Sequence, residues 1–141
     1  MRIRRTAWTA TALVAALMVM VPATMVLAEP PNPFIGSWEA MDDFGADQST
    51  NRLMVGGNLH VVYHEDGLTA CLNAYDQFVG GTGTAVGGID GDTLSFEIEI
   101  FCELRGGKNL PVGPFLFEMV YDDLTDTLTA PDGTVFNRQG S

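Results

Sequence analysis

Hydrophobic and polar residues alternate along much of the chain after residue 33, with the period of two that a half-buried β-strand requires. The segment 93–103 shows this alternation most clearly. One side of it carries Leu94, Phe96, Ile98, Ile100 and Cys102, and the other carries Thr93, Ser95, Glu97, Glu99 and Glu103. Phe101 alone breaks the polar set. No segment after residue 33 has helical periodicity of useful length, so the pattern predicts an all-β domain.

Shorter β-favouring runs follow one another with turn residues between them. The strands predicted in this way are 34–41, 50–55, 58–64, 68–74, 82–89, 93–103, 112–121, 127–130 and 134–138. Asp-Gly occurs at three of the predicted turns, ending at Gly67, Gly91 and Gly133. Asp-Gly between strands indicates a hairpin, because glycine adopts a positive φ without steric cost. Consecutive strands are therefore expected to be antiparallel neighbours.

Eight or nine short strands must cover one apolar face and protect the edges of the sheet. Closure into a small antiparallel up-and-down β-barrel does both, and a β-sandwich is the alternative. The turns follow one another as in a meander, which favours the barrel. The glycine-rich segment 80–91 suits a bend or a tightly curved strand.

The first 28 residues have the pattern of a signal peptide. Arg2, Arg4 and Arg5 precede the apolar run 7–21, and Pro22 and small residues up to Ala28 follow it. An uncleaved anchor helix is the alternative. Cleavage after Ala28 would leave a Pro-rich lead-in, 29–33, and a single domain, 34–141. We therefore expect a secreted or periplasmic protein without stable membrane insertion after cleavage.

The charge of the chain after residue 28 limits the kinds of molecule that it can bind. All 18 acidic residues lie after residue 28, where only Arg52, Arg105, Lys108 and Arg138 are basic, so this part carries a formal charge of −14. Such a surface repels the phosphates of nucleic acids and anionic lipids, and it favours cations or basic partners. We expect no nucleic-acid binding.

Cys71 and Cys102 are the two cysteines of the chain. An even pair in a small exported domain predicts one disulfide, and two free buried thiols are the alternative. A bridge between them would close a loop of about 30 residues and stabilise the fold by about 3–4 kcal/mol.

A Gly-x-Trp sequence, Gly36 to Trp38, opens the first predicted strand, and Arg138 stands on the last. In this respect the chain resembles the lipocalin and avidin-type barrels, which together form the calycin group. It also resembles small secreted bacterial β-barrel proteins with the same opening. The resemblance implies that Arg138 packs on the Trp38 ring by a cation–π contact. The domain expected after cleavage is shorter than a typical lipocalin and shows no obvious long helix before its end, which does not favour a deep ligand cup.

The same resemblance implies a binding module for a small apolar ligand held inside the barrel. Its predicted lining residues are Trp38, Tyr63, Phe96, Phe117 and Met119, all of which would also serve as core. The alternative function is an extracellular or envelope structural or protein-interaction domain without a pocket.

Several polar groups have some features of a chemical site, but none has the full pattern of one. His60 and His64 share a strand face too far apart to bind one ion, even with Glu65 or Asp66 nearby. Glu97 and Glu99 have a spacing found in glycosidases but are expected on the solvent face. The segment 122–126 has the oxygens of a calcium site, yet such acidic turns are common. We expect no enzyme activity, cofactor or metal.

Overall fold

The computed structural model describes residues 31–44, 47–67, 71 and 78–140. Its strands are β1 (Gly36–Phe44), β2 (Asp47–Val55), β3 (His60–Asp66), β4 (Phe78–Val86), β5 (Gly88–Asp90), β6 (Thr93–Leu104), β7 (Asn109–Asp122), β8 (Thr127–Thr129) and β9 (Val135–Arg138). The expected strand 68–74 lies outside the described residues, except for Cys71, which is in a turn. No helix in the described part of the chain is long and apolar enough to cross a membrane.

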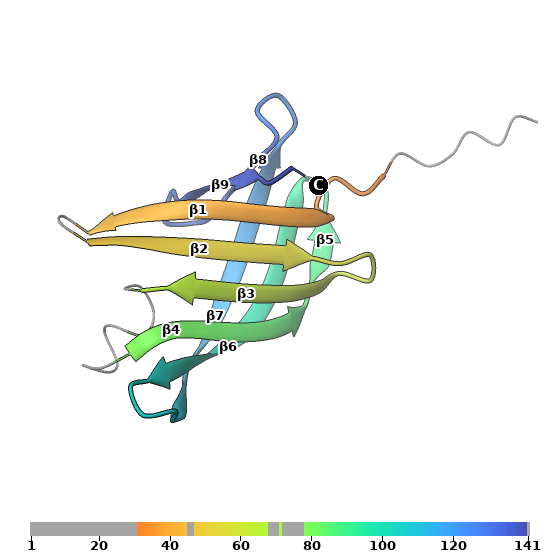
Figure 1. Cartoon of the computed structure of the whole chain (residues 1–141). Coiled ribbons are helices and arrows are strands. Elements are labelled where there is room, and N and C mark those ends of the chain that lie inside the picture. The colour runs from red at the N-terminus through yellow and green to blue at the C-terminus, as the bar shows by residue number, and fades with distance from the viewer. Residues whose placement is uncertain (1–30, 45–46, 68–70, 72–77, 141) are drawn as a thin grey trace, which may run out of the picture.

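The strands close into an antiparallel barrel. Each of β1 to β4 pairs with the next, β6 to β9 do the same, and the two halves join where β9 pairs with β1 and β4 pairs with β6. β5 is an extra strand that forms a hairpin with β6. In Figure 1, β1 to β4 lie across the front and β6 and β7 cross steeply behind them. The predicted up-and-down barrel is therefore confirmed, with eight strands in the closed barrel, and the sandwich is excluded.

Glycines allow β4 to close against β6. A Cβ atom on Gly83 would lie 2.6 Å from the Glu99 carbonyl oxygen and 2.8 Å from Ile98. The predicted continuous strand 82–89 is wrong in one respect, because it divides at Gly87 into β4 and β5. β4 and β5 both pair with β6, and they do so in the same register. The break at Gly87 is therefore a bend within one curved stretch of chain.

Most of the other strand boundaries also differ from the prediction by a few residues, for example at β4, which begins at Phe78 instead of residue 82, and at β7, which begins at Asn109 instead of residue 112. Phe34 lies in a turn before β1, where its backbone N–H donates to Asn32 Oδ1 at 3.0 Å. β2 begins at Asp47 instead of residue 50. β3 continues through Asp66, whereas a turn was expected from Glu65 onward, because pairing with β2 extends to Thr50 and Asp66.

The core occupies the interior of the barrel. All five apolar positions of the alternating segment in β6 are buried, and Phe101, which broke the pattern, is 45% exposed. On β7, Met119 is buried and the inward-facing aromatic residues are partly buried against the core, whereas the residues between them are exposed. The period of two thus predicts correctly which side chains enter the barrel.

One end of the barrel is filled by Phe34, Trp38, Tyr121, Asp126 and Arg138, and we call it the closed end. The Arg138 guanidinium carbon lies 4.0 Å from the centroid of the Trp38 ring, as the resemblance implied. Arg138 Nε donates to both oxygens of Asp126, at 2.7 and 2.9 Å. Tyr121 packs edge-on against the rings of Phe34 and Trp38.

Backbone groups complete the closed end. The other two guanidinium nitrogens of Arg138 donate to the carbonyl oxygens of Pro33 and Ile35, and the Trp38 indole N–H donates to the Phe34 carbonyl at 2.9 Å. Gly36 has a φ of 144°, and a Cβ on it would lie 2.7 Å from an Arg138 nitrogen. The glycine of Gly-x-Trp is thus required because the arginine passes directly over it.

Candidate functional site

A cavity of about 110 Å³ lies toward the other end of the barrel, which we call the cavity end. Strands β2, β3, β6, β7 and β9 and the turn between β8 and β9 contribute to its wall. Its described lining residues are Asn51, Tyr63, Glu65, Ile100, Phe115, Phe117, Ala130, Asp132, Thr134 and Phe136. The cavity reaches the surface at Asp132, an exposed residue.

Aromatic side chains form much of the cavity wall. Tyr63, Phe115, Phe117 and Phe136 all line it. The ring centroids of Tyr63 and Phe117 are 5.7 Å apart, and Phe117 stacks on Phe96 at 5.1 Å with an interplanar angle of 12°. These contacts join β3 to β7 and β6 across the interior, so they hold the aromatic wall in place.

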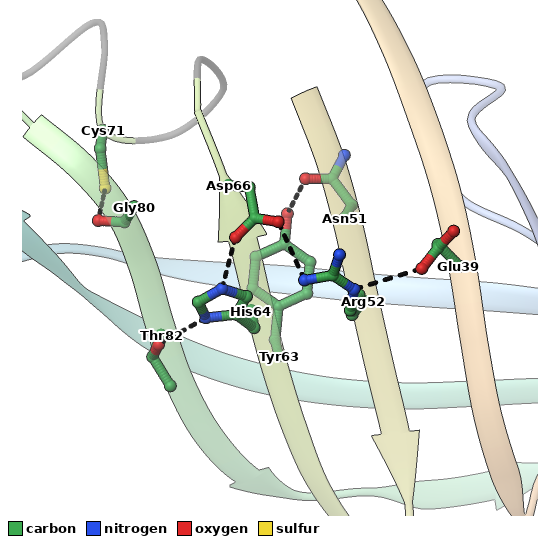
Figure 2. A network of polar contacts seen from close by, with 9 residues as sticks. All are labelled: Glu39, Asn51, Arg52, Tyr63, His64, Asp66, Cys71, Gly80 and Thr82. Carbon is green, nitrogen blue, oxygen red and sulfur yellow. Dashed lines mark hydrogen bonds and ion pairs between the residues drawn. The ribbon is translucent and has the colours of Figure 1, made fainter. Parts of the chain in front are cut away.

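Polar side chains meet the aromatic wall on the β2–β3 side. Glu65 has no exposed surface, and Asn51 lies directly opposite it in the β2–β3 pairing and is also buried. The Tyr63 hydroxyl lies 3.1 Å from Glu65 Oε2 and 3.0 Å from Asn51 Oδ1. The Tyr63 hydroxyl therefore links the carboxylate to the amide at the margin of the cavity, and Figure 2 shows it directed toward Asn51.

The disulfide holds a second donor against Glu65. Cys71 and Cys102 are bonded, as predicted, and both are fully buried. The Cys71 backbone N–H donates to Glu65 Oε1 at 3.3 Å. A Cβ on Gly81 would lie 2.9 Å from the Cys71 sulfur and 3.3 Å from Glu65 Cγ, so a glycine on β4 makes room for both groups. The bridge thus ties the Cys71 turn to β6 beside the carboxylate.

The interior changes from apolar to polar along β2 and β3. The paired inward residues are apolar at Val55 and Val61, whereas Asn51 pairs with Glu65 nearer the cavity end. Ser49, one step further along the inner face of β2, is also fully buried, and its hydroxyl has no hydrogen-bond partner among the described residues. Buried polar groups are costly unless they are hydrogen-bonded, so their concentration at one end distinguishes that end from the rest of the core.

The predicted ligand-lining residues fall into two groups. Tyr63 and Phe117 line the cavity. Trp38, Phe96 and Met119 are buried but are not among the described residues that line it. Trp38 belongs to the closed end, and Phe96 stacks on Phe117, its direct partner in the pairing of β6 with β7.

Sequence reasoning missed the polar side of the cavity. The sequence suggested Glu65 only as a possible metal-binding partner of the histidines, because the Asp66 and Gly67 that follow it are typical of an exposed turn. A usable signal was present, since Val61, Tyr63 and Glu65 continue one period-two face and all three are buried. Extending the alternation by one step would have placed the carboxylate inside the barrel.

A second polar cluster lies on the outer face of β1 to β4. Arg52 bridges Glu39 at 3.2 Å and Asp66 at 2.9 Å, and the ring of His64 lies between Asp66 and Thr82, at 2.7 and 3.0 Å (Figure 2). The hydrogen bond with His64, followed by the charge of Arg52, lowers the pKa of the Asp66 carboxyl below its ordinary value. The groups are about half exposed, so this cluster is a solvated surface network.

The other groups considered as sites lie on the surface. Glu97 and Glu99 are exposed on the outer face of β6, as expected. Asp126 pairs with Arg138, and Asp122 Oδ1 accepts the Leu124 N–H at 2.9 Å within the turn. Among the residues that the structure describes, no group of three or more His, Cys, Asp or Glu side chains is placed to hold a metal ion.

A second hollow, with a volume of about 310 Å³, lies on the outer surface of the barrel. It lies over the starts of β1 and β3 and the end of β2, and Met54, 57% exposed, and Ile35 contribute apolar surface to it. None of its described lining residues carries a carboxylate, and it has no aromatic wall like that of the cavity, since its described lining includes no Phe, Tyr or Trp.

Comparison of the chain with protein-family models, with curated proteins and with solved structures finds no match in any of the three. The fold and the geometry of the cavity therefore carry the functional argument.

Proposed function

We propose that the protein is an exported binding module that holds a small, largely apolar ligand in the cavity at the cavity end. The observation that carries the proposal is a cavity whose described lining includes four aromatic side chains and a few buried polar groups. Ligand sites in proteins typically have this composition, in which apolar walls supply affinity and a few polar groups fix orientation.

The size of the cavity limits the ligand. Pockets for drug-sized molecules have volumes of about 300–1,000 Å³, whereas a cavity of about 150 Å³ in another protein holds benzene. A volume of about 110 Å³ therefore suits a ligand, or a protruding group of a larger one, of about five non-hydrogen atoms. Fatty acids and other long lipids are too large to enter fully.

Export is part of the proposal. A buried disulfide is compatible with a location outside the cytoplasm, because oxidising compartments allow such bonds to persist. The basic and apolar pattern of residues 1–28 supports the same location. Mass spectrometry of the exported protein should give a first residue of Glu29. A chain that keeps residues 1–28 would argue for an anchored protein instead.

We also propose that the barrel is of the calycin type. The support is the closed end, where Arg138 packs on Trp38 as the resemblance implied and passes close over Gly36. The inward aromatic residues and the antiparallel eight-stranded closure are compatible with this relationship.

A series of neutral probes of increasing size tests the binding function. Isopropanol, tert-butanol and benzene would be titrated into the folded protein while the NMR signals of Ile100 and Phe115 are followed. We expect saturable shifts with dissociation constants on the order of millimolar, because so few ligand atoms are buried. Ala130→Phe should fill the cavity and abolish the shifts, whereas Val86→Phe on the exposed face of β4 should leave them unchanged. Absence of saturable shifts with all three probes would end the proposal.

A further inference from the structure

We infer that the ligand of this cavity is a small organic cation of the alkylammonium class. The inference rests on the proposed function and specifies it. Three features of the described residues support it: the sign of the charges that line the cavity, its aromatic wall, and the buried position of Glu65.

The charges at the cavity are all of one sign. Glu65 and Asp132 line it with carboxylates, and Asn51 and Thr134 add side chains with oxygen atoms. None of the described lining residues is basic. The part of the chain after residue 28 carries a formal charge of −14, so the field of the whole domain attracts cations as well. An anionic ligand would meet repulsion both at long range and at the site.

The aromatic wall suits a cation without a strong hydration shell. The faces of aromatic rings attract positive charge, and alkylammonium groups are recognised in cages of such rings. Tyr63 and Phe117 form one corner of the wall, with ring centroids 5.7 Å apart. Phe115 and Phe136 approach the same space from β7 and β9. The methyl groups of an alkylammonium ion would contact these rings, and its charge would lie within their electrostatic reach.

Glu65 supplies the counter-charge. Its carboxylate has no exposed surface and accepts hydrogen bonds from the Tyr63 hydroxyl and the Cys71 backbone N–H. These donors, one held by β3 and the other by the disulfide, fix the carboxylate beside the cavity. A cation in the cavity would be attracted by this negative charge, whereas a neutral hydrocarbon would gain nothing from it.

The test compares two probes of nearly the same size and shape, tetramethylammonium chloride and tert-butanol, at constant ionic strength. NMR titration of Ile100 and Phe115 gives both affinities. We expect the cation to bind at least about tenfold more tightly than the alcohol. Equal affinities, or preference for the alcohol, would overturn the cation inference while leaving the proposed binding function in place. If neither probe binds, the cation inference fails, and the titrations with isopropanol and benzene decide whether the binding function fails with it.

Two variants test whether the charge of Glu65 causes the preference for the cation over the alcohol. Glu65→Gln keeps the shape of the side chain and removes its charge, and it should lower tetramethylammonium affinity about tenfold while leaving tert-butanol affinity unchanged. Glu97→Gln, on the exposed outer face of β6, removes the same charge from the surface and should change neither affinity. Equal loss in both variants would show nonspecific attraction to an acidic surface and would contradict the inference. If Glu65→Gln does not fold, as judged by circular dichroism, the wild-type comparison decides alone.

Discussion

The two ends of the barrel solve different physical problems. At the closed end, polar groups are matched: Arg138 donates to Asp126 and to two backbone carbonyls while it covers Trp38. At the cavity end, Glu65 and Asn51 are buried beside open space, and the Ser49 hydroxyl lacks a partner among the described residues. The closed end is filled, whereas the cavity end has open volume beside buried, hydrogen-bonded polar groups.

This difference indicates a division of labour. Full packing and paired charges stabilise a fold, whereas a cavity costs stability because its walls lose contacts. Binding sites are commonly less well packed and less stable than the scaffold that carries them. We therefore expect substitutions at the closed end to change stability most, and substitutions at the cavity end to change binding most.

Truncation of Trp38 should have the largest effect. The side chain is fully buried, and Trp38→Ala removes its packing against Tyr121 and Arg138, so we expect the free energy of unfolding to fall by about 3–5 kcal/mol. Urea denaturation followed by circular dichroism measures the change. Leu124→Ala, at a 91% exposed position of the nearby turn, is the control and should have almost no effect. A loss below about 1 kcal/mol for Trp38→Ala would show that the closed end is not the main support.

Removal of the disulfide should have the next largest effect on stability. It should also weaken binding at the cavity end. The bridge spans a sequence separation of 31, and the double variant Cys71→Ser with Cys102→Ser should lose about 3–4 kcal/mol by the loop-entropy argument. Because Cys71 also donates to Glu65, we expect weaker probe binding as well. Urea denaturation and probe titration, each with the wild-type protein as reference, separate these two effects. Unchanged binding in the folded double variant would show that the bridge does not position the site.

Acid should weaken the closed end in a defined way. The hydrogen bond from Arg138 lowers the pKa of the Asp126 carboxyl. A lowered pKa in the folded state adds stability that is complete above the ordinary Asp value of about 3.9 and is lost as the pH falls through the lowered value. Asp126→Asn should therefore reduce stability at pH 7 and make its decline below about pH 4 less steep. Urea midpoints measured from pH 7 to 3 test this, and parallel curves for both proteins would contradict it.

The smallest expected effect is on stability and is in the stabilising direction. Ser49→Ala removes a fully buried hydroxyl that has no partner among the described residues, so stability should stay unchanged or rise by up to about 1 kcal/mol. Thr50→Ala, at the neighbouring half-buried position, is the matched control. A clear loss of stability in Ser49→Ala, measured by thermal unfolding, would mean that the hydroxyl is satisfied in solution.

The sequence predicted the barrel and the closed end better than the cavity. Alternation in β6 identified its inward face, because a strand's period of two is a local property. The contact of Arg138 with Trp38 followed from a resemblance in two short motifs. The cavity depends instead on how Tyr63 and Phe117 meet across the interior, which is decided by pairings between distant strands. Glu65 was missed because a charged residue before Asp-Gly usually belongs to an exposed turn.

The most direct test of the account is an NMR titration with tetramethylammonium that reports both ends at once. The account predicts saturable shifts for Ile100 and Phe115 at the cavity end, and no shift for the Trp38 indole N–H, which is bonded to the Phe34 carbonyl at the closed end. Saturable shifts at Trp38 without shifts at Ile100 and Phe115 would contradict the assignment of binding to the cavity end.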